Sequence, residues 1–510
     1  MDASPQARAT DGGGKPHVLV VPFPAQGHLL PLLDLVALLA ARGLAITVAV
    51  TAGTAALLDP LVAAFPSVDA VVLPFPSSPL LPAGCGENAK DLPAGYLLRP
   101  FMASLAALRA PLLAWCKAQG QGQGGRGVTA ILSDFFMGWT QPLAAELGVP
   151  RVAFSPSSAF YLAMTQSLWR DVPRRRRPDE AVAFPEIPGS PSFPWRHLSS
   201  LFRRHVPGDE LSEAIRQSFL WNQDSECVVV NSFAALEAPY LRSHQTGTGK
   251  RMLAVGPLSD AVGTSTNVDR GGKPTVATAD VTAWLDARGE EGSVVYVSFG
   301  TQYAMPPDHA ACVADALARS SAAFVWAVRR GTAVPEGFEA ATASRGVVIR
   351  GWAPQVQVLR HRAVGWFLTH CGWNSLLEAA AAGVAMLTWP VEADQFTDAW
   401  QVAEAGVAVP VAEGADAMPD AGKVAEAIDA AMMGKEGCSV RERAVELSRK
   451  AAAAVAEGGS SRRDLEELVQ ILTTVVYLCF PTWCPTVYLL KRFEVIDNDL
   501  GVPIYVFQDV

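Results

Sequence analysis

The segment WAPQVQVLRHRAVGWFLTHCGWNSLLEAAAAGVAMLTWPVEADQ, residues 352–395, places an apolar strand, a tight turn and a helix in immediate succession. Residues 365–369 are a short apolar run that predicts a buried strand, and residues 370–372 turn the chain. Residues 374–382 predict a helix that ends at Gly383. The Asn and Ser at the predicted helix start are cap residues, and the free N–H groups there can bind an anion.

Three polar side chains share one face of this predicted helix. Asn374 and Glu378 are four residues apart, and Ser375 and Glu378 are three apart. His370 lies at the strand end, one turn away. This set suits a phosphate at the helix start, with Glu378 reaching a hydroxyl beyond it. A cap that serves only the helix would use the same residue types. Only the spacing of the whole segment can distinguish a phosphate site from such a cap.

That spacing resembles the signature box of plant UDP-dependent glycosyltransferases. The matched positions read W-A-P-Q, H-C-G-W-N-S, E, G-V, P and D-Q, and the 44 residues from Trp352 to Gln395 are the length of that box without a gap. Ala385 departs from the pattern, because the family usually has Pro there. The resemblance covers roughly residues 16–472. It implies the GT-B fold: an α/β chain with two doubly wound, Rossmann-like domains that face each other across a cleft.

The resemblance also implies a set of UDP-sugar-binding residues. Trp352 stacks on uracil, Gln355 contacts the base or ribose, and Glu378 takes the ribose hydroxyls. The sugar is contacted by Trp373 and by the final Asp-Gln pair, whose Gln goes with UDP-glucose in the family, whereas His more often goes with UDP-galactose. The full implied set is Ser298, Gly300, Thr301, Trp352, Ala353, Gln355, His370, Trp373, Asn374, Ser375, Glu378, Asp394 and Gln395.

The diphosphate is expected to bind without a metal ion. His370, Asn374, Ser375 and the helix start would neutralise it. The loop Ser298-Phe-Gly-Thr301 follows a predicted strand, and the family uses this loop to approach the diphosphate. Its glycine is the residue type that permits close backbone approach. The UDP-sugar is a co-substrate, so no cofactor is expected.

The first half of the chain begins as a parallel doubly wound sheet. Residues 17–22 predict a buried strand, residues 29–42 a helix and residues 45–51 the next strand. His28 lies in the turn PFPAQGH at the carboxyl end of the first strand, and Asp134 ends the strand AILSD. A lone histidine at such a position is more often structural than catalytic, and a simple helix cap is the alternative role for Asp134. The match to the family's P-F-P-x-Q-G-H implies instead that His28 is the general base and that Asp134 holds it.

The alternation of strands and helices divides the chain. Further strands are expected at 70–73, 128–133, 151–154, 227–230, 252–255, 293–299, 322–328, 346–349, 385–389 and 407–411, with a helix at 97–117. The expected organisation is a flexible N-terminus at 1–15, an acceptor-binding domain at 16–255, a linker at 256–274, a UDP-sugar-binding domain at 275–459, a helix at 460–472 that returns to the first domain, and an atypical tail of unknown role at 473–510. The pair Ser461 and Asp464 predicts a capping box on the returning helix.

Composition excludes several other classes of protein. A net charge of −9 argues against a nucleic-acid binder. The eight cysteines form no CxxC pair, so a zinc site is not expected. The N-terminus has no apolar signal core, and no run of about 18 apolar residues predicts a membrane span. A cytoplasmic monomer without integral membrane association is expected.

The residues therefore predict an inverting glycosyltransferase that moves a hexose, glucose by preference, from a UDP-sugar to a hydroxyl of a small plant metabolite such as a flavonoid or another phenolic. UDP-rhamnose and UDP-galactose remain alternative donors. A non-catalytic sugar-nucleotide sensor is a second alternative. A nicotinamide-dependent oxidoreductase is a third, but the pattern Gly122-x-Gly124-x-x-Gly127 follows a predicted helix and precedes a strand, which is the wrong order for a dinucleotide fingerprint.

Overall fold

The computed structural model describes residues 16–119, 127–261, 275–415 and 418–474, and two strands at 493–497 and 503–507. The chain forms two compact units, Met1–Thr473 and Thr474–Val510. In the second unit, strands β16 (Phe493–Asp497) and β17 (Pro503–Phe507) pair antiparallel. Most of the predicted linker, the glycine pattern at 122–127 up to its last residue, and most of the tail lie outside the described residues.

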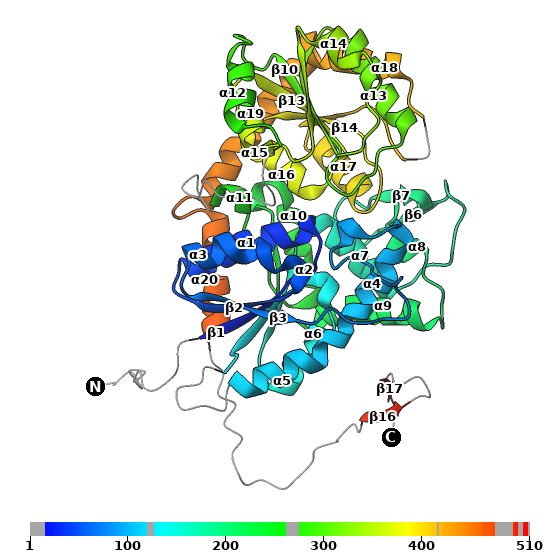
Figure 1. The fold of residues 1–510 in the computed structure, drawn as a ribbon. Coiled ribbons are helices and arrows are strands. Elements are labelled where there is room, and N and C mark those ends of the chain that lie inside the picture. Colours follow the sequence, from blue (N-terminus) through cyan, green and yellow to red (C-terminus); the bar gives the residue numbers. More distant parts are fainter. Residues whose placement is uncertain are drawn as a thin grey trace. The chain divides into compact units, whose positions relative to one another are not determined.

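The first sheet of the large unit is parallel and has seven strands in the order β3-β2-β1-β4-β5-β8-β9 (Figure 1). The strands are β1 (His17–Val21), β2 (Ala45–Thr51), β3 (Val68–Leu73), β4 (Ala130–Asp134), β5 (Arg151–Ser155), β8 (Cys227–Val230) and β9 (Met252–Ala254). The central strands are short, mostly apolar and buried, as strands covered on both faces must be, whereas the edge strand β3 exposes Asp69, Ala70 and Val72. Two apolar clusters pack on the sheet, and both draw residues from the central strands.

Helices and a short hairpin surround this sheet. The α-helices are α1 (Gln26–Ala40), α2 (Ala52–Ala55), α3 (Asp59–Ala64), α4 (Leu98–Ser104), α5 (Arg109–Gln119), α6 (Thr140–Leu147), α7 (Ala159–Arg170), α8 (Ser200–Arg203), α9 (Glu210–Leu220), α10 (Ala234–Thr248) and α11 (Leu258–Ala261), and the hairpin is β6 (Ala181–Ala183) with β7 (Ser192–Pro194). The helix expected at 97–117 is broken into α4 and α5 by a 3₁₀ segment at Leu105–Leu108.

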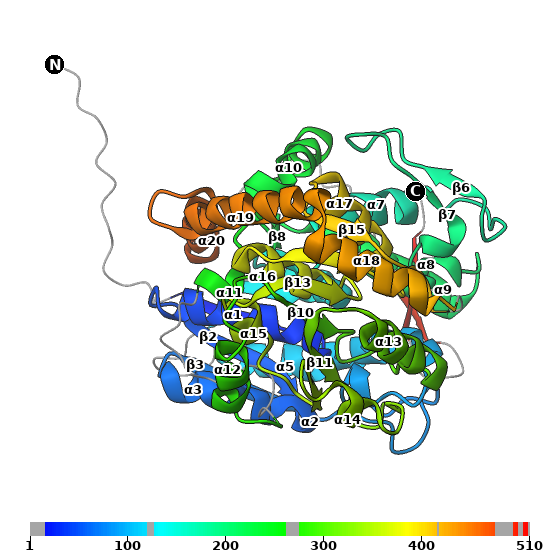
Figure 2. The ribbon, with the colours of Figure 1, turned by 90° about the horizontal axis from the view of Figure 1, so that it is seen from above.

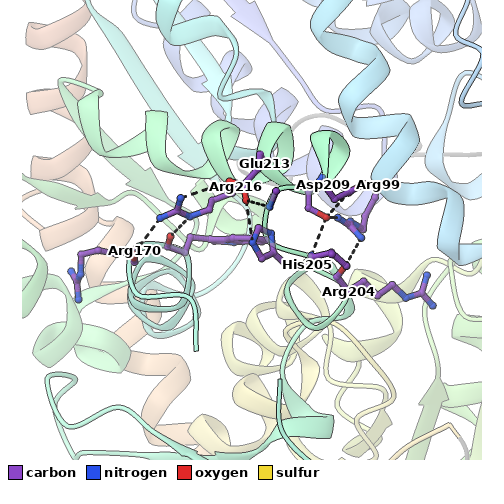
Figure 3. A network of polar contacts seen from close by, with 11 residues as sticks. Arg99, Arg170, Arg204, His205, Asp209, Glu213 and Arg216 are labelled. Carbon is purple, nitrogen blue, oxygen red and sulfur yellow. Dashed lines mark hydrogen bonds and ion pairs between the residues drawn. The ribbon is translucent and has the colours of Figure 1, made fainter. Parts of the chain in front are cut away.

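A polar network fastens α9 to its neighbours. Arg99 of α4 donates to Ser212 Oγ at 2.6 Å and to the carbonyl of Arg204 at 2.7 Å, while Arg216 of α9 donates to the carbonyl of Trp169 at 3.0 Å (Figure 3). These bonds tie α9 to α4, α7 and the segment after α8. The network therefore fixes the helices that form an apolar pocket described below.

The second sheet is also parallel, with six strands in the order β12-β11-β10-β13-β14-β15. Its strands are β10 (Val294–Ser298), β11 (Ala323–Val328), β12 (Gly346–Arg350), β13 (Val364–Thr369), β14 (Ala385–Thr388) and β15 (Ala408–Pro410). Its helices are α12 (Thr278–Asp286), α13 (Pro307–Arg319), α14 (Phe338–Thr342), α15 (Gln355–Leu359), α16 (Trp373–Ala382), α17 (Gln395–Glu404), α18 (Ala421–Met433) and α19 (Lys435–Val455). The predicted α/β class with two doubly wound sheets is confirmed.

The last helix of the large unit, α20 (Ser460–Thr473), packs on the first sheet. It follows α19, which it contacts (Figure 2). Leu465, Leu468 and Leu472 enter the apolar cluster that covers β1, and α20 lies against β9. The predicted capping box is wrong: Ser461 donates to the carbonyl of Gly256 at 2.7 Å, and the Asp464 carboxylate accepts from the backbone N–H of Ala254 at 2.8 Å. Both side chains anchor the helix to the first domain because the sheet edge supplies partners for them.

One helical stretch of the described residues, Gly95–Gln119, is long and apolar enough by length and composition to cross a membrane. It includes α4 and α5, and its residues Phe101, Leu105, Leu108 and Leu112 are buried in the core of the first domain. The sequence analysis expected no such stretch. Its apolar character is explained by its packing, because a core helix of a folded domain passes the same test.

Candidate active site

The carboxyl ends of β1 and β4 bring His28 and Asp134 together. The two strands are neighbours in the sheet, with Val21 beside Ser133, so the residues that follow them meet at one edge. His28 Nδ1 lies 2.9 Å from Asp134 Oδ2, and Asp134 Oδ1 accepts from the backbone N–H of Phe136 at 2.8 Å. The Asp134 side chain is fully buried, whereas 17 % of the His28 side chain is exposed. A carboxylate bound to Nδ1 leaves Nε2 free to accept a proton.

Aromatic rings surround this pair. His28 lies 4.6 Å from Phe136 and 5.1 Å from Phe23 between ring centroids, and it stacks on Phe135 at 5.8 Å. Such walls exclude water and fix the imidazole plane. The side chain that could act as a base therefore lies in an apolar setting with one side accessible.

The loop between β13 and α16 forms the opposite part of the site. Helix α16 begins at Trp373 with Gly372 as its N-cap, and no side chain caps it. The sequence analysis expected Asn374 and Ser375 to serve as caps, and that part of the prediction is wrong. The first N–H groups of α16 lack a side-chain acceptor from the cap residue, which leaves them available to an anion.

Two predicted residues at the start of α16 bind the first domain. The Trp373 indole N–H donates to the carbonyl of Asn231 at 2.7 Å, and the Asn374 amide donates to the carbonyl of Gly27 at 2.7 Å. Gly27 precedes His28, so these bonds hold the start of α16 beside the imidazole. In this structure, both side chains join the two domains.

His370 is held between two glycines. A Cβ atom added at Gly300 would lie 2.6 Å from His370 Nε2, and one added at Gly372 would lie 2.7 Å from the same atom. Burial lowers the pKa of His370 to about 4. The imidazole is therefore neutral near pH 7 and offers a hydrogen bond without a net charge. The expectation that His370 helps to neutralise a diphosphate stays a prediction, because a bound anion would itself raise the pKa of this imidazole.

A connected set of polar side chains lies along α16. The Gln355 amide nitrogen donates to Ser375 Oγ at 3.1 Å and to Glu378 Oε2 at 2.8 Å, and the Tyr296 hydroxyl donates to Gln355 Oε1 at 3.3 Å. The geometry brings three of the predicted residues into contact. A carboxylate accepts hydrogen bonds from hydroxyl groups, so Glu378 is chemically suited to a ribose.

The remaining predicted residues lie at the carboxyl edge of the second sheet. Ser298 ends β10 and is buried, and Thr301 is partly exposed. Trp352 and Ala353 follow β12 and are partly exposed, and the Trp352 carbonyl accepts from the backbone N–H of Thr275 at 3.0 Å. A partly exposed indole on this edge is available for stacking.

Asp394 and Gln395 begin α17. Asp394 Oδ2 accepts from Ser157 Oγ of the first domain at 2.8 Å. Gln395 Oε1 accepts from the backbone N–H groups of Val391 and Glu392 at 2.9 and 3.0 Å, so the amide oxygen is used by its own loop. Asp394 and Gln395 therefore offer a carboxylate oxygen and an amide N–H₂ group. Burial raises the pKa of Asp394, and the bond from Ser157 opposes that rise.

Backbone strain marks the same loops. Among the described residues, three non-glycine residues have positive φ values: Ser190 at 45°, Cys371 at 69° and Ala393 at 59°. Ser190 lies in the loop before β7, whereas Cys371 and Ala393 each lie just before a predicted site residue or the helix start. Left-handed conformations at non-glycine residues cost energy and cluster at functional loops.

The sequence analysis missed a polar layer between the two domains. Ser158 Oγ donates to Asp398 Oδ1 at 2.8 Å, and the Gln401 amide donates to Glu237 Oε1 at 2.8 Å. Glu237 also accepts from the first two N–H groups of α7, at 2.9 and 3.0 Å. Burial raises the pKa values of Asp398 and Glu237, strongly so for Asp398. The spacing of Asp394, Asp398 and Gln401 on one helix face was the available signal.

An apolar pocket lies between α7, α8 and α9. Its lining includes Met164, Trp169, Phe202 and Phe219, with Thr397 from α17. Phe219 contacts Phe135 and Phe136 at 5.8 and 5.6 Å between ring centroids, so aromatic rings continue from this pocket to those that surround the imidazole.

Comparison with known proteins agrees with this geometry. The family model described as UDP-glucoronosyl and UDP-glucosyl transferase matches residues 270–449. The flavonol 3-O-glucosyltransferase UGT89B1 of Arabidopsis thaliana is 44 % identical over 473 residues, which cover 89 % of this chain and 96 % of that protein. The crystal structure of Arabidopsis thaliana UGT89C1 complexed with UDP-L-rhamnose superposes with a TM-score of 0.74 at 33 % identity, covering 90 % of this chain and all of that one. A structure of the same protein with quercetin gives a TM-score of 0.72 at 32 % identity and the same coverage.

Proposed function

Because the chain belongs to the UDP-dependent glycosyltransferases of plants, we propose that it transfers glucose from UDP-glucose to a hydroxyl group of a flavonoid or a related phenolic. The names of its relatives describe transfer of a sugar from a UDP-sugar, in one case to a flavonol. We assign the same general reaction, transfer to a phenolic, to this chain. The observation that carries the proposal is the His28–Asp134 pair, which lies within an aromatic wall beside the start of α16.

In the proposed reaction, His28 Nε2 removes the proton from the acceptor hydroxyl. The acceptor oxygen then attacks the anomeric carbon of the sugar in line, the bond from that carbon to the diphosphate oxygen breaks, and UDP leaves with its electron pair. The configuration at the anomeric carbon is inverted. Asp134 stabilises the imidazolium that forms and holds its Nδ1–H. The buried Asp134 carboxylate is well placed for this role, because it is already bonded to Nδ1.

The leaving diphosphate would meet hydrogen-bond donors of this chain. These are the uncapped N–H groups of α16 and the neutral imidazole of His370. The loop of Ser298, Gly300 and Thr301 approaches the same imidazole through Gly300. We propose that this set needs no metal ion. Turnover should persist in EDTA, and loss of turnover that added Mg²⁺ or Mn²⁺ restores would reject this part of the proposal.

The acceptor class is supported by the aromatic surroundings of the base. Phe23, Phe135 and Phe136 around His28 suit a flat aromatic ring, and the pocket of α7, α8 and α9 extends this apolar surface. A flavonol and quercetin are named for two relatives. A phenolic hydroxyl is also acidic enough for an imidazole base to assist its deprotonation.

The donor sugar depends on the start of α17. Asp394 presents a carboxylate oxygen and Gln395 an amide N–H₂ group, which together can accept from and donate to adjacent hydroxyls of a hexose. UDP-L-rhamnose is bound in one related structure, and it is the second candidate donor. A site built to bond a hydroxyl group discriminates against donors that lack it.

Competition between donors tests the proposal. Purified protein is incubated with quercetin and equal concentrations of UDP-glucose, UDP-L-rhamnose and UDP-galactose, and the products are separated by liquid chromatography against the authentic glucoside, rhamnoside and galactoside. We expect the glucoside to dominate, and Gln395→Ala to raise the KM for UDP-glucose while the affinity for UDP stays nearly unchanged. A dominant rhamnoside or galactoside would replace the donor assignment. Binding of UDP-sugars without turnover on any phenolic would favour the sensor alternative.

A further inference from the structure

Arg151, the first residue of β5, is a buried cation next to the proposed base pair. Only 1 % of the residue is exposed. Its Nε donates to Thr140 Oγ1 at 2.7 Å and to Ser133 Oγ at 2.9 Å, its Nη1 to Ser225 Oγ at 2.7 Å, and its Nη2 to Asn222 Oδ1 at 2.9 Å. These four acceptors are neutral. Four neutral hydrogen bonds do not explain why a charged side chain is buried, because a polar neutral residue would avoid the desolvation cost.

The partners of Arg151 enclose the turn that carries Asp134. Ser133 directly precedes Asp134, and Thr140 begins the helix that follows the turn. The middle of the turn is held as well, because the Asn222 amide that accepts from Arg151 through Oδ1 donates through Nδ2 to the carbonyl of Phe135 at 2.8 Å. One guanidinium thus fixes both ends and the centre of the segment 133–140. That segment also carries the two phenylalanine rings that contact His28.

The charge of Arg151 acts on Asp134. Burial lowers the pKa of Arg151 to about 9, and the carboxylates of Asp134 and Asp224 oppose that change. The guanidinium is therefore still protonated near pH 7. The other charged groups that face this region are His28 on α1, Asp394 on α17, which senses the charge of His28, and Lys250, which donates to the carbonyl of Ser225.

We infer that Arg151 is a positioning residue for the reaction: it holds the 133–140 turn, keeps Asp134 ionised in its apolar setting and so keeps His28 oriented and free to accept a proton. The inference rests on the proposed function. Arg151 does not touch the reacting atoms; it acts through Asp134. A surface carboxylate would need no such partner, but Asp134 is fully buried and has two hydrogen bonds.

The sign of the expected pH effect follows from the charge. The active form of the pair has His28 neutral and Asp134 ionised. Removal of a nearby positive charge favours uptake of one proton by the pair, whichever of the two groups receives it. The acid limb of the kcat/KM profile should therefore move to higher pH, and raising the pH should restore much of the lost activity.

The test compares Arg151→Met and Arg151→Lys with wild type. The pH profile of kcat/KM is measured with UDP-glucose and quercetin, and the titration of the His28 ring nitrogens is followed by NMR without substrates. Arg151→Met should move both the acid limb and the His28 titration upward by about one pH unit or more. Arg151→Lys keeps the charge but loses the forked geometry, so it should lower the melting temperature and leave both titrations within about 0.3 unit of wild type.

Two further variants separate this role from a purely structural one. Arg216→Met is the control, because Arg216 also donates to backbone carbonyls of the first domain, and its charge is paired with Glu213 at 3.8 Å (Figure 3). It should lower the melting temperature without moving the acid limb. In an Asp134→Asn background, Arg151→Met should move the His28 titration by less than half of its effect in wild type, because the group through which it acts is gone.

The outcomes are distinct. An Arg151→Met protein that is folded, has lower activity at every pH and keeps the wild-type titration of His28 would overturn the inference. An equal shift in the Asp134→Asn background would also overturn it. If the wild-type protein turns over no acceptor, the proposed function fails, yet the NMR titration still decides whether Arg151 controls the pair. If Arg151→Met does not fold, Arg151→Gln, which keeps hydrogen-bond donors but loses the charge, replaces it: the same upward shift of the His28 titration supports the inference, and an unchanged titration overturns it.

Discussion

Gly300→Ala should weaken the binding of UDP through the displacement of His370. Gly300 has a φ of 72°, in the left-handed region, and an added Cβ would lie 2.6 Å from His370 Nε2. Gly372 also lies against the imidazole, because a Cβ added there would be 2.7 Å from the same nitrogen, so the backbone of a second loop limits the movement of the ring. One methyl group therefore forces the imidazole out of the position in which it would bond the diphosphate.

The magnitude can be worked out from two contributions. Alanine in the left-handed region costs about 1–2 kcal/mol relative to glycine, and this lowers the stability of the fold. Loss of one hydrogen bond to a charged group costs about 1.5–3 kcal/mol, and this weakens binding. Since about 1.4 kcal/mol corresponds to a factor of ten, the Kd for UDP should rise by roughly ten- to a hundredfold.

Isothermal titration of UDP measures this change directly, and Gly148→Ala is the matched control. Gly148 ends α6 with a φ of 66°, and an added Cβ there would meet no atom within 4 Å. Both variants should lose similar stability, as thermal unfolding will show, but only Gly300→Ala should lose affinity for UDP. If Gly300→Ala binds UDP as tightly as Gly148→Ala does, the assigned role of the His370 imidazole is wrong.

Three more predictions concern the base, a buried acid and the tail. His28→Ala should lower turnover by about 10²–10⁴-fold. Calorimetry should show unchanged binding of UDP, because the base and the nucleotide site lie on different sheets. Near-normal turnover, most clearly with a weakly acidic alcohol as acceptor, would reject His28 as the general base. Burial raises the pKa of Asp398 in the folded protein. Its contribution to the free energy of unfolding is therefore fully present at pH values below the ordinary carboxyl pKa, and it is lost as the pH rises through the raised pKa. Asp398→Asn should therefore raise the melting temperature at pH 8 more than at pH 5, and an equal or opposite effect would contradict this. A chain that ends at Thr474 should remain folded and active, because the leucines of α20 already complete their apolar cluster; an inactive or insoluble product would show that the tail is needed.

The sequence predicted the sheets well because buried parallel strands are continuous apolar runs. The strand expected at 45–51 is β2 without a change, and the strand expected at 365–369 differs from β13 by one residue. The pairing of His28 with Asp134 was expected from the family resemblance, and the structure shows the contact because the two strands are neighbours in the sheet. Local pattern was sufficient for the strands, but the pairing needed the resemblance.

Other parts of the site depend on information that local pattern does not contain. The bond between Ser157 and Asp394 joins residues 237 positions apart, and it exists only because of the way the two sheets face each other. The neutral state of His370 follows from its burial between two glycines, which no residue type near it reveals. The helix start of α16 was misjudged because Asn374 has a stronger partner in the first domain than at its own helix.

The position of α17 has a consequence for the exchange of domains between relatives. This helix begins with the residues assigned to the sugar, yet Asp398 and Gln401 on it are bonded to Ser158 and Glu237 of the other half of the chain. A chimaera that takes α17 from one parent and α7 from another would leave buried polar groups without their partners, at a cost of about 1–3 kcal/mol for each group left unsatisfied. The donor-binding half is therefore not a separable module. Engineers who graft it should move Ser157, Ser158 and Glu237 together with the helix.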